Sequence, residues 1–228
     1  MENIQKFFTK KLDIPNMPKD FIDNGIIFQE MMMEYSCAIN EICTKLENLS
    51  TEFQLKHKHN PIQSISHRLK SPVSIIRKLN DKFGVFNLHL IKENLDDVAG
   101  VRVICSYIED IYEVAKLLTD QDDVTLIETK DYIKIPKESG YRSLHLIVEV
   151  PVFLASGKTP IKVEIQIRTI AMDFWASLEH ELMYKVDVDV PADIRKQLKD
   201  CAKTIADTDE QMQEIHKRIS LMEDKNSI

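Results

Sequence analysis

Glycine is scarce in this chain of 228 residues, which contains only five: Gly25, Gly84, Gly100, Gly140 and Gly157. Neither the dinucleotide-binding pattern GxGxxG nor the phosphate-binding pattern GxxxxGK[ST] can be written with glycines so far apart. If the protein holds phosphates, side chains and helix ends must therefore take the place of a glycine-rich loop.

Other signals are missing as well. The four cysteines include no CxxC pair, and the N-terminus has no long apolar stretch, so we expect reduced thiols, a cytoplasmic location and no membrane segment. The net charge of −7 argues against a dedicated DNA-binding protein. The histidines show no metal-ligand spacing, since "HELMY" lacks the second histidine of HExxH.

Acidic residues are absent from positions 53–80, although the chain as a whole is acidic. The cationic residues of this segment are Lys56, Lys58, Arg68, Lys70, Arg77 and Lys78. A purely basic segment in an acidic protein indicates a site for a small anion, and a solvated basic face is the alternative.

Hydrophobic periodicity predicts alternating helices and strands within one domain. Helices are expected at 19–49, from 71–72 onward, at 109–120, from a cap at Thr169 to about 185, and at 192–222. Strands are expected at 101–108, 123–133, 141–150 and 161–168, and "HNPIQSIS" (59–66) is interpreted as a break. We therefore expect the chain to consist of a polar tail (1–18), one domain with a leading helix (19–186), and a linker with a C-terminal helix (187–228).

Two of these strands are apolar on one side only. Residues 144, 146, 148 and 150 share an apolar face in the first strand, and residues 161, 163, 165 and 167 do so in the second. The opposite faces carry Tyr141, Ser143 and His145 in one strand and Glu164 and Gln166 in the other. An exposed antiparallel face would explain polar residues in general, but this combination favours a functional site.

"HRLKSPVS" (67–74) combines cations with a helix start. Arg68 and Lys70 precede Ser71-Pro72, a typical cap and first helical position, and Ser74 lies in the first turn. Lys78 lies one turn further on the same face. Free N–H groups beside cations suit a polyphosphate, although an ordinary capped helix is the alternative.

"NLDDVAGVRV" (94–103) places a carboxylate, Asp97, just before a strand. If the fold brings Glu164 close to it, the two carboxylates could hold Mg²⁺ against phosphates. Asp-Asp is by itself a weak signal, and the pairing with Glu164 gives it value.

"KESGYRSLHL" (137–146) places an aromatic ring, Tyr141, behind a Ser-Gly turn. Nucleotide bases stack on such rings. The nearby cations Lys130, Lys134, Lys137 and Arg142 favour a nucleotide over a free base, and a partly buried strand tyrosine is the alternative.

Four stretches in this order resemble the synthetase domain of the RelA/SpoT family. They are "HRLKSPVSIIRKL", "LDDVAGVRVIC", "DYIKIPKESGYRSLHL" and "VEIQIRTIAMDFWASLEH", and they span about residues 60–186. With only flanking helices besides, the chain resembles a stand-alone small alarmone synthetase. The resemblance implies an α+β fold, a mixed sheet of nucleotidyltransferase type surrounded by helices, with long N- and C-terminal helices.

The resemblance also implies an activity, the transfer of the β,γ-pyrophosphate of ATP to the ribose 3′-OH of GDP or GTP, with release of AMP. Arg68, Lys70, Ser74, Lys78 and Arg102 match ATP contacts, and Lys130 is expected as a further ATP contact at a position where some relatives carry arginine. Tyr141 matches the ring that stacks on guanine, and Lys137, His145 and Gln166 match acceptor contacts, to which the neighbouring Arg142 is added. Asp97 matches a Mg²⁺ ligand, and Glu164 matches a carboxylate that assists Mg²⁺ or activates the 3′-OH. The role of Asp173 is left open, and no hydrolase activity is expected.

The final predicted helix carries a long apolar seam with steps of three and four. Its members are Ile194, Leu198, Cys201, Ile205, Thr208, Met212, Ile215, Ile219 and Met222. The seam favours pairing with a second subunit, and packing on its own domain is the alternative. Small members of the family form homotetramers, so the resemblance implies a homotetramer here.

Two further functions stay open at this point. One is a catalytically weak nucleotide-binding regulator or RNA-binding module that uses the same basic cleft. The other is an enzyme of this fold that pyrophosphorylates a different ribose hydroxyl, on an adenine nucleotide or an RNA end. Retention of both Asp97 and Glu164 favours catalysis, because a binding protein has no need of two metal-ligating carboxylates.

Overall fold

The computed structural model describes residues 25–84, 87–184 and 190–226. The predicted tail (1–18) and most of the predicted linker lie outside these ranges. The helices are α3 (Gly25–Lys56), α4 (Pro72–Phe83), α5 (Leu88–Asn94), α6 (Ile108–Thr119), α7 (Ile170–Tyr184) and α8 (Ala192–Asn226). The strands are β1 (Ile62–Leu69), β2 (Ala99–Cys105), β3 (Thr125–Asp131), β4 (Leu144–Leu154) and β5 (Gly157–Thr169).

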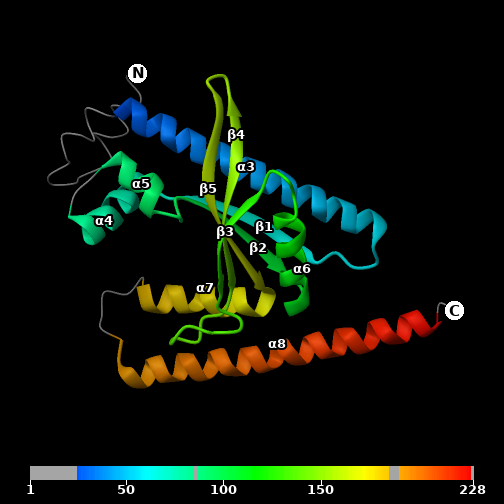
Figure 1. Ribbon diagram of the computed structural model, residues 1–228. Helices are drawn as coiled ribbons and strands as arrows, with labels where there is room; N and C mark the ends of the chain where they lie inside the picture. Colours follow the sequence, from blue (N-terminus) through cyan, green and yellow to red (C-terminus); the bar gives the residue numbers. More distant parts are fainter. Residues whose placement is uncertain (1–24, 85–86, 185–189, 227–228) are drawn as a thin grey trace.

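The five strands form one mixed sheet in the order β1-β2-β5-β4-β3 (Figure 1). Only β2 and β5 run parallel, and the other neighbouring pairs are antiparallel. Long helices flank this sheet at both ends of the described chain (Figure 1). The predicted fold class, a mixed sheet surrounded by helices, is confirmed.

The hydrophobic core lies on one face of the sheet. The alternating apolar residues of β4 and β5 are buried there against α3 and α6. The long helix α3 contributes Tyr35, Ile39, Ile42 and Leu46, which repeat at steps of three and four and therefore form one stripe. The opposite face of β4 and β5 remains available for the polar side chains.

The prediction of a break at 59–66 was wrong, because Ile62–Leu69 forms β1 at the edge of the sheet. This strand is mostly exposed, and a bulge between Ile62 and Ser64 disturbs its alternation. It therefore lacks the apolar period that identifies a half-buried strand. The short helix α5, capped by the Asn87 side chain, was also missed, and β4 begins at Leu144, so Tyr141 precedes the strand.

Two predicted helix caps are confirmed. The Ser71 side chain accepts a hydrogen bond from the Ser74 backbone N–H at the start of α4. The Thr169 hydroxyl accepts one from the Met172 backbone N–H at the start of α7. These caps fix where both helices leave the ends of strands β1 and β5.

Helix α8 packs on its own domain, mainly through small and polar residues. The Trp175 indole N–H donates to the Leu198 carbonyl (3.1 Å), and the Thr169 hydroxyl donates to buried Asp209 (2.6 Å). Burial raises the pKa of the Asp209 carboxyl, and the hydrogen bond from Thr169 opposes this shift. Of the predicted seam, Leu198 and Ile205 are half-buried in this contact.

Other seam residues face away from the domain. Ile194, Met212, Ile215, Ile219 and Met222 are between 43% and 58% exposed. Helix α8 therefore has one face docked on the domain and an apolar stripe outside it. None of the described helices combines the length and apolar character of a membrane span.

Candidate active site

The polar face of the sheet carries a continuous row of functional side chains. Strand pairing places Ser66 beside Arg102, Arg102 beside Gln166, Gln166 beside His145, and His145 beside Lys130. The next row contains Arg68, Gly100 and Glu164. Residues that are up to a hundred positions apart in the sequence are thus aligned across all five strands.

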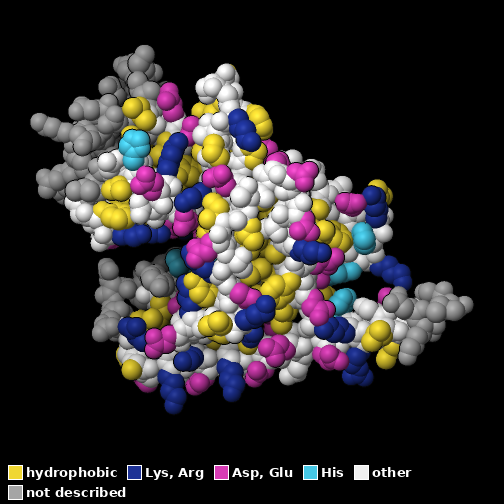
Figure 2. Space-filling model, viewed as in Figure 1, with side chains coloured by type: hydrophobic (Ala, Val, Ile, Leu, Met, Phe, Trp, Pro, Cys, Tyr) yellow, Lys and Arg dark blue, Asp and Glu magenta, His cyan; other side chains and the backbone are white. Residues whose placement is uncertain are grey.

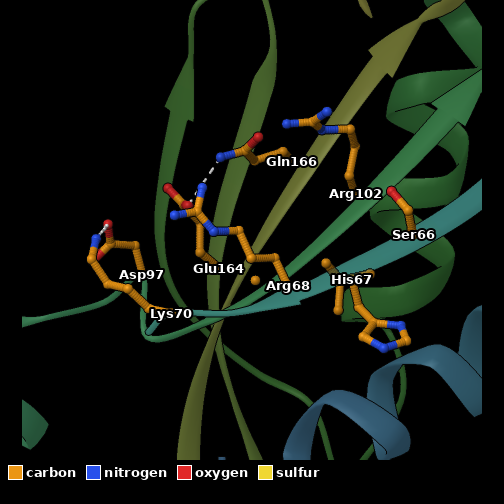
Figure 3. A pocket seen from close by; sticks show the side chains of 10 residues that line it. Ser66, His67, Arg68, Lys70, Asp97, Arg102, Glu164 and Gln166 are labelled. Atoms are coloured by element: carbon orange, nitrogen blue, oxygen red, sulfur yellow. Dashed lines mark hydrogen bonds and ion pairs between the residues drawn. The ribbon is translucent and has the colours of Figure 1, made fainter. Parts of the chain in front are cut away.

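A cavity of about 290 Å³ lies over one end of these rows. Its charged lining consists of Arg68, Lys70, Arg102, Asp97 and Glu164. Figure 3 shows Lys70 and Asp97 at one end, Arg102 and Gln166 at the other, and Arg68 and Glu164 between them. The cations predicted for phosphate and the two carboxylates predicted for Mg²⁺ therefore meet in one place.

Asp97 is held by two lysines at this cavity. Its carboxylate accepts hydrogen bonds from Lys70 (2.6 Å) and from Lys78 of helix α4 (2.9 Å). Burial raises the pKa of the Asp97 carboxyl, but the hydrogen bonds and charges of the two lysines outweigh burial and hold the pKa below its ordinary value. Asp97 is therefore ionised at neutral pH, and the two lysine ammonium groups lie directly beside it.

Glu164 projects from the middle of β5 between polar partners. It accepts hydrogen bonds from His145 (Nδ1 to Oε1, 3.2 Å) and from the Gln166 amide (3.0 Å). Burial raises the pKa of the Glu164 carboxyl, but the hydrogen bonds from His145 and Gln166 outweigh burial. The pKa of this carboxyl therefore lies below its ordinary value. The charge of Asp97 opposes this lowering, as expected for carboxylates that share a site.

A hydrogen-bonded chain connects the predicted guanine platform to Glu164. Arg168 donates to the Tyr141 hydroxyl (2.6 Å), and that hydroxyl lies 2.8 Å from His145 Nε2. The other ring nitrogen of His145, Nδ1, lies 3.2 Å from Glu164, so the imidazole bridges the Tyr141 hydroxyl and the carboxylate. The ring of Tyr141 is thereby fixed relative to the carboxylate.

Lys137 lies over the aromatic platform. Its ammonium group is 5.0 Å from the centre of the Tyr141 ring and 4.7 Å from that of Tyr132. Tyr132 also contacts His145 edge-on, with ring centres 5.2 Å apart. The predicted acceptor residues Tyr141, Lys137, His145 and Gln166 are therefore brought together.

Three predicted residues lie less centrally. Ser74 is on α4, one turn before Lys78, where its hydroxyl is 2.8 Å from that of Ser71. Lys130 is on edge strand β3 and pairs with Glu128 (3.0 Å), beside His145 and away from the cations of the cavity. Arg142 donates to the Ile133 carbonyl (3.1 Å) and approaches Glu210 of α8, so its contacts are structural, and its nucleotide role stays a prediction.

Arg102 has an unused donor. Its Nε is buried and has no hydrogen-bond partner among the described residues, while its NH1 lies 3.4 Å from Asp173. A buried donor without an acceptor is costly unless a ligand supplies one. The Nε of Arg142, whose other contacts are structural, is likewise buried without a partner, so this feature alone does not identify a phosphate-binding arginine.

The sequence prediction did not assign a role to Arg168, which organises the site. This side chain is only 4% exposed and bonds Tyr141, Gln166 and Asp173. Its position two residues after Gln166 places it on the same polar face, and that alternation was the available signal. Asp173, whose role was left open, bridges Arg168 and Arg102.

A metal ion would find part of its ligand set here. Asp97 and Glu164 line one cavity, and both pKa shifts favour the ionised form that binds Mg²⁺. Within the described ranges no cluster of three or more His, Cys, Asp and Glu side chains suits a metal ion. Two carboxylates without a third ligand fit Mg²⁺, which usually completes its shell with phosphate oxygens and water.

A basic cleft with two carboxylates and a stacking ring, on the polar face of a mixed sheet, is the site of an enzyme that acts on nucleotide phosphates. The profile described as "Region found in RelA / SpoT proteins" matches residues 67–189. The chain belongs to the RelA/SpoT family.

Two GTP pyrophosphokinases align with most of the chain. GTP pyrophosphokinase YwaC of Bacillus subtilis is 46% identical over 82% of this chain and 90% of its own length. GTP pyrophosphokinase YjbM of the same organism is 37% identical over 82% of this chain and 88% of its own length. The predicted family is therefore confirmed.

Solved structures agree with the fold. Small alarmone synthetase 1 from Bacillus subtilis, bound to its product pppGpp, has a TM-score of 0.78 and 36% identity, covering 84% of this chain and 97% of the other. Small alarmone synthetase 2 from the same organism has a TM-score of 0.76 and 44% identity, covering 84% and 98%. Another structure of synthetase 1 is bound to AMPCPP, with a TM-score of 0.72 and 32% identity, covering 85% and 97%.

Proposed function

We propose that this protein transfers the β,γ-pyrophosphate of ATP to the ribose 3′-OH of GDP or GTP, producing ppGpp or pppGpp and AMP. The observation that carries the proposal is the meeting of a cation cluster and two ionised carboxylates in one cavity, joined through His145 to Tyr141. Relatives named GTP pyrophosphokinase support the same reaction.

The ATP side of the site is the group of cations around Asp97. Arg68, Lys70 and Arg102 line the cavity, and Lys78 reaches it through its bond to Asp97. With ATP bound, these side chains neutralise and orient the triphosphate, and the buried Arg102 Nε gains a phosphate oxygen as acceptor. Ser74 adds a hydroxyl at the start of α4.

The acceptor side is the platform of Tyr141 with Lys137, His145 and Gln166. Arg168 lies over the Tyr141 ring, with its Cζ 5.1 Å from the ring centre, and its own hydrogen bonds hold it there. Guanine therefore stacks on the face that the Lys137 ammonium covers. Stacking there turns the ribose toward Glu164, because His145 ties the ring to that carboxylate.

The reaction is a direct transfer between two nucleotides, so the protein has to position and activate the attacking hydroxyl and forms no covalent intermediate of its own. The 3′-oxygen attacks the β-phosphorus of ATP, the bond from that phosphorus to the α,β-bridging oxygen breaks, and AMP leaves. The 3′-OH proton passes to Glu164, which is ionised at neutral pH and retains lone pairs for a further hydrogen bond.

Asp97 and Glu164 would hold Mg²⁺ together with phosphate oxygens. When bound, the ion supplies charge neutralisation and polarises the phosphoryl oxygens. Lys70 and Lys78 would then exchange part of their contact with Asp97 for contact with the ATP phosphates.

The assembly and the location are further parts of the proposal. The exposed stripe on α8 would be covered by a second subunit in a homotetramer, which gives residues 187–228 an oligomerisation role next to the synthetase domain. A cytoplasmic location accords with the four cysteines, all of which are free thiols.

The proposal is tested by incubating the pure protein with ATP labelled in the γ-phosphate, Mg²⁺ and one acceptor at a time: GMP, GDP, GTP or ADP. Label should move to the 3′ position of the guanine nucleotide, with unlabelled AMP as co-product. Equal turnover with GDP and ADP would contradict the guanine assignment, and labelled inorganic phosphate as the sole product would contradict the transfer.

A further inference from the structure

Asp173 lies in the first turn of helix α7, directly after the end of strand β5. Its carboxylate approaches two guanidinium groups, because Oδ1 lies 3.1 Å from NH1 of Arg168 and 3.4 Å from NH1 of Arg102. The Thr169 hydroxyl, which caps α7, fixes the turn that carries Asp173. One carboxylate oxygen is thus shared by two arginines from the neighbouring strands β2 and β5.

Arg168 belongs to a closed ring of hydrogen-bonded side chains. Its NH2 group donates to the Tyr141 hydroxyl (2.6 Å) and to Oε1 of Gln166 (3.0 Å). The Tyr141 hydroxyl reaches one oxygen of Glu164 through His145, and the Gln166 amide donates to the other oxygen (3.0 Å). Because these five side chains hold one another, a displacement of Arg168 would disturb the stacking ring and the carboxylate together.

Arg102 belongs to the ATP-side cavity, which it lines together with Arg68 and Asp97. Figure 3 shows it at the end of this cavity that Gln166 also lines. The Arg102 side chain is 41% exposed, whereas that of Arg168 is 5% exposed and is absent from the cavity lining. An anion in the cavity therefore contacts Arg102 and not Arg168.

Positive charge is concentrated around Asp173. Figure 2 shows Lys and Arg side chains mixed with Asp and Glu over the visible face of the molecule, whereas Arg102 has two further arginines close to it. Burial lowers the pKa of the Arg102 guanidinium, the charges of Arg168 and Arg68 lower it further, and the charge of Asp173 opposes them. Asp173 therefore offsets the repulsion between Arg102 and Arg168.

We propose that Asp173 is a positioning residue that couples the two nucleotide subsites. An anion bound at Arg102 strengthens the hold of Asp173 on Arg168, and this orders the Tyr141 ring for the acceptor. The proposal rests on the proposed function, which places ATP and the guanine nucleotide in these subsites. It adds that each nucleotide raises the affinity for the other through a single carboxylate.

The coupling follows from how Asp173 divides its charge. Its contact with Arg102 is the longer of the two, and Arg102 is the arginine that a ligand reaches, so the ATP phosphates draw Arg102 away from the carboxylate. Asp173 then interacts with Arg168 alone. Arg168 is held more firmly, and with it the hydroxyl of Tyr141.

Calorimetry tests the coupling through the Kd of GDP, measured without and with saturating AMPCPP and Mg²⁺. AMPCPP replaces ATP because a methylene group takes the place of the α,β-bridging oxygen, so the pyrophosphate cannot be transferred. AMPCPP should lower the Kd of GDP about fivefold or more in the wild type. GDP should lower the Kd of AMPCPP by the same factor, since coupling between binding sites is reciprocal.

Asp173→Ala removes the shared carboxylate, so AMPCPP should then change the Kd of GDP by less than about twofold. Asp173→Asn keeps the size of the side chain without its charge and should also reduce the factor. Asp173→Glu restores the charge and should recover part of it. Glu181→Ala, which removes an exposed acid of the same helix, is the matched control and should leave the factor unchanged.

A purely structural role of Asp173 predicts a different result, namely that Asp173→Ala weakens GDP binding equally with and without AMPCPP. That result would overturn the proposal, and so would a wild-type protein in which AMPCPP leaves the Kd of GDP unchanged. Failure of the proposed function is distinguishable. A wild type that binds GDP and AMPCPP cooperatively, but transfers no pyrophosphate from ATP, would contradict the reaction and leave the coupling in place.

Discussion

Glu164 and His145 lie on neighbouring strands, with Glu164 Oε1 3.2 Å from His145 Nδ1, and the opposite nitrogen of the same imidazole lies 2.8 Å from the Tyr141 hydroxyl. One side chain thus fixes both Glu164, the proposed proton acceptor, and Tyr141, the ring proposed to stack on the base. The geometry of the acceptor is set before any nucleotide binds.

Glu164→Gln tests the carboxylate directly. The amide has the size of the carboxylate but cannot accept the proton of the 3′-OH, so we expect turnover to fall on the order of 100-fold or more. Steady-state rates with ATP and GDP measure the loss, and circular dichroism with thermal melting checks that the variant is folded. Near-normal turnover in a folded protein would contradict the assigned role.

Tyr141→Ala removes the stacking surface. We expect the affinity for GDP to fall by about 1–3 kcal/mol, with little change for ATP. Calorimetry of both ligands measures the difference. Tyr141→Phe is the control, because it keeps the ring and loses only the bonds to Arg168 and His145. If the alanine variant weakened ATP binding more than GDP binding, the assignment of the Tyr141 ring to the acceptor nucleotide would be contradicted.

Arg68→Ala should give the opposite pattern from Tyr141→Ala. Arg68 lines the cavity beside Lys70, so its loss should weaken ATP binding by about 1.5–3 kcal/mol while GDP binding changes little. The same calorimetric titrations measure it. Equal weakening of both nucleotides would show that Arg68 supports the fold of the site and not one phosphate chain.

Acid should destabilise the protein partly through Asp97. Its folded pKa lies below the ordinary value, so its contribution to stability is present above the unfolded pKa of about 3.9 and is lost as pH falls through the folded pKa. The free energy of unfolding of the wild type should therefore decrease more steeply below about pH 4 than that of Asp97→Asn. Denaturant titrations at several pH values compare the slopes, and parallel curves would contradict the assignment.

The stripe on α8 should control the size of the particle. Ile215→Asp with Ile219→Asp puts two charges into exposed apolar positions, which is costly only if a partner subunit covers them. Light scattering should show a multiple of 26.5 kDa for the wild type and a smaller species for the double variant. Gln211→Asp with Arg218→Asp, on exposed polar positions of the same helix, is the control. A monomeric wild type at micromolar concentration would leave the stripe without this role.

Gly140→Ala should loosen the acceptor loop. Gly140 has φ of +93°, and an added Cβ would lie 2.5 Å from the Ala202 Cβ of α8, so the loop and the helix would have to separate. We expect weaker GDP binding with ATP binding unchanged. Ala202→Gly in the same chain removes the clash but not the backbone strain and should restore part of the affinity, whereas no recovery would mean that φ alone decides.

The sequence was most informative where chemistry and periodicity coincide. The alternation in β5 correctly separated the buried side chains from Glu164 and Gln166, and the ordered motifs identified the family. In β4 the alternation did not do so, because residues 144–148, His145 and Ile147 included, are buried on both faces. The prediction also failed at β1, because an exposed edge strand with a bulge has no apolar period to detect. The alignment of Arg68 with Glu164 depends on strand pairing across the sheet, which no local pattern specifies.

Long-range packing explains the other differences. Arg142 follows Tyr141 and has the right charge for a nucleotide, yet the loop turns it toward Ile133 and α8. The seam on α8 has a regular period, but only Leu198 and Ile205 among its members pack on the domain. The other residues with which α8 contacts the domain are Ala202, Asp209 and Gln213. Side chains this small or polar are not recognised as a docking face by hydrophobicity.

The parallel pairing of β2 with β5 has a consequence for how the protein becomes active. Asp97 precedes β2 and Glu164 lies in β5, so the two carboxylates meet only after α6, β3 and β4 have been synthesised and the chain has returned to the centre of the sheet. Pairings between strands so far apart in sequence form slowly, because loop-closure entropy is lost before contacts compensate for it. A nascent chain that ends before Glu164 lacks one of the two carboxylates. After dilution from denaturant, the synthetase activity should return with the slowest refolding phase of the sheet.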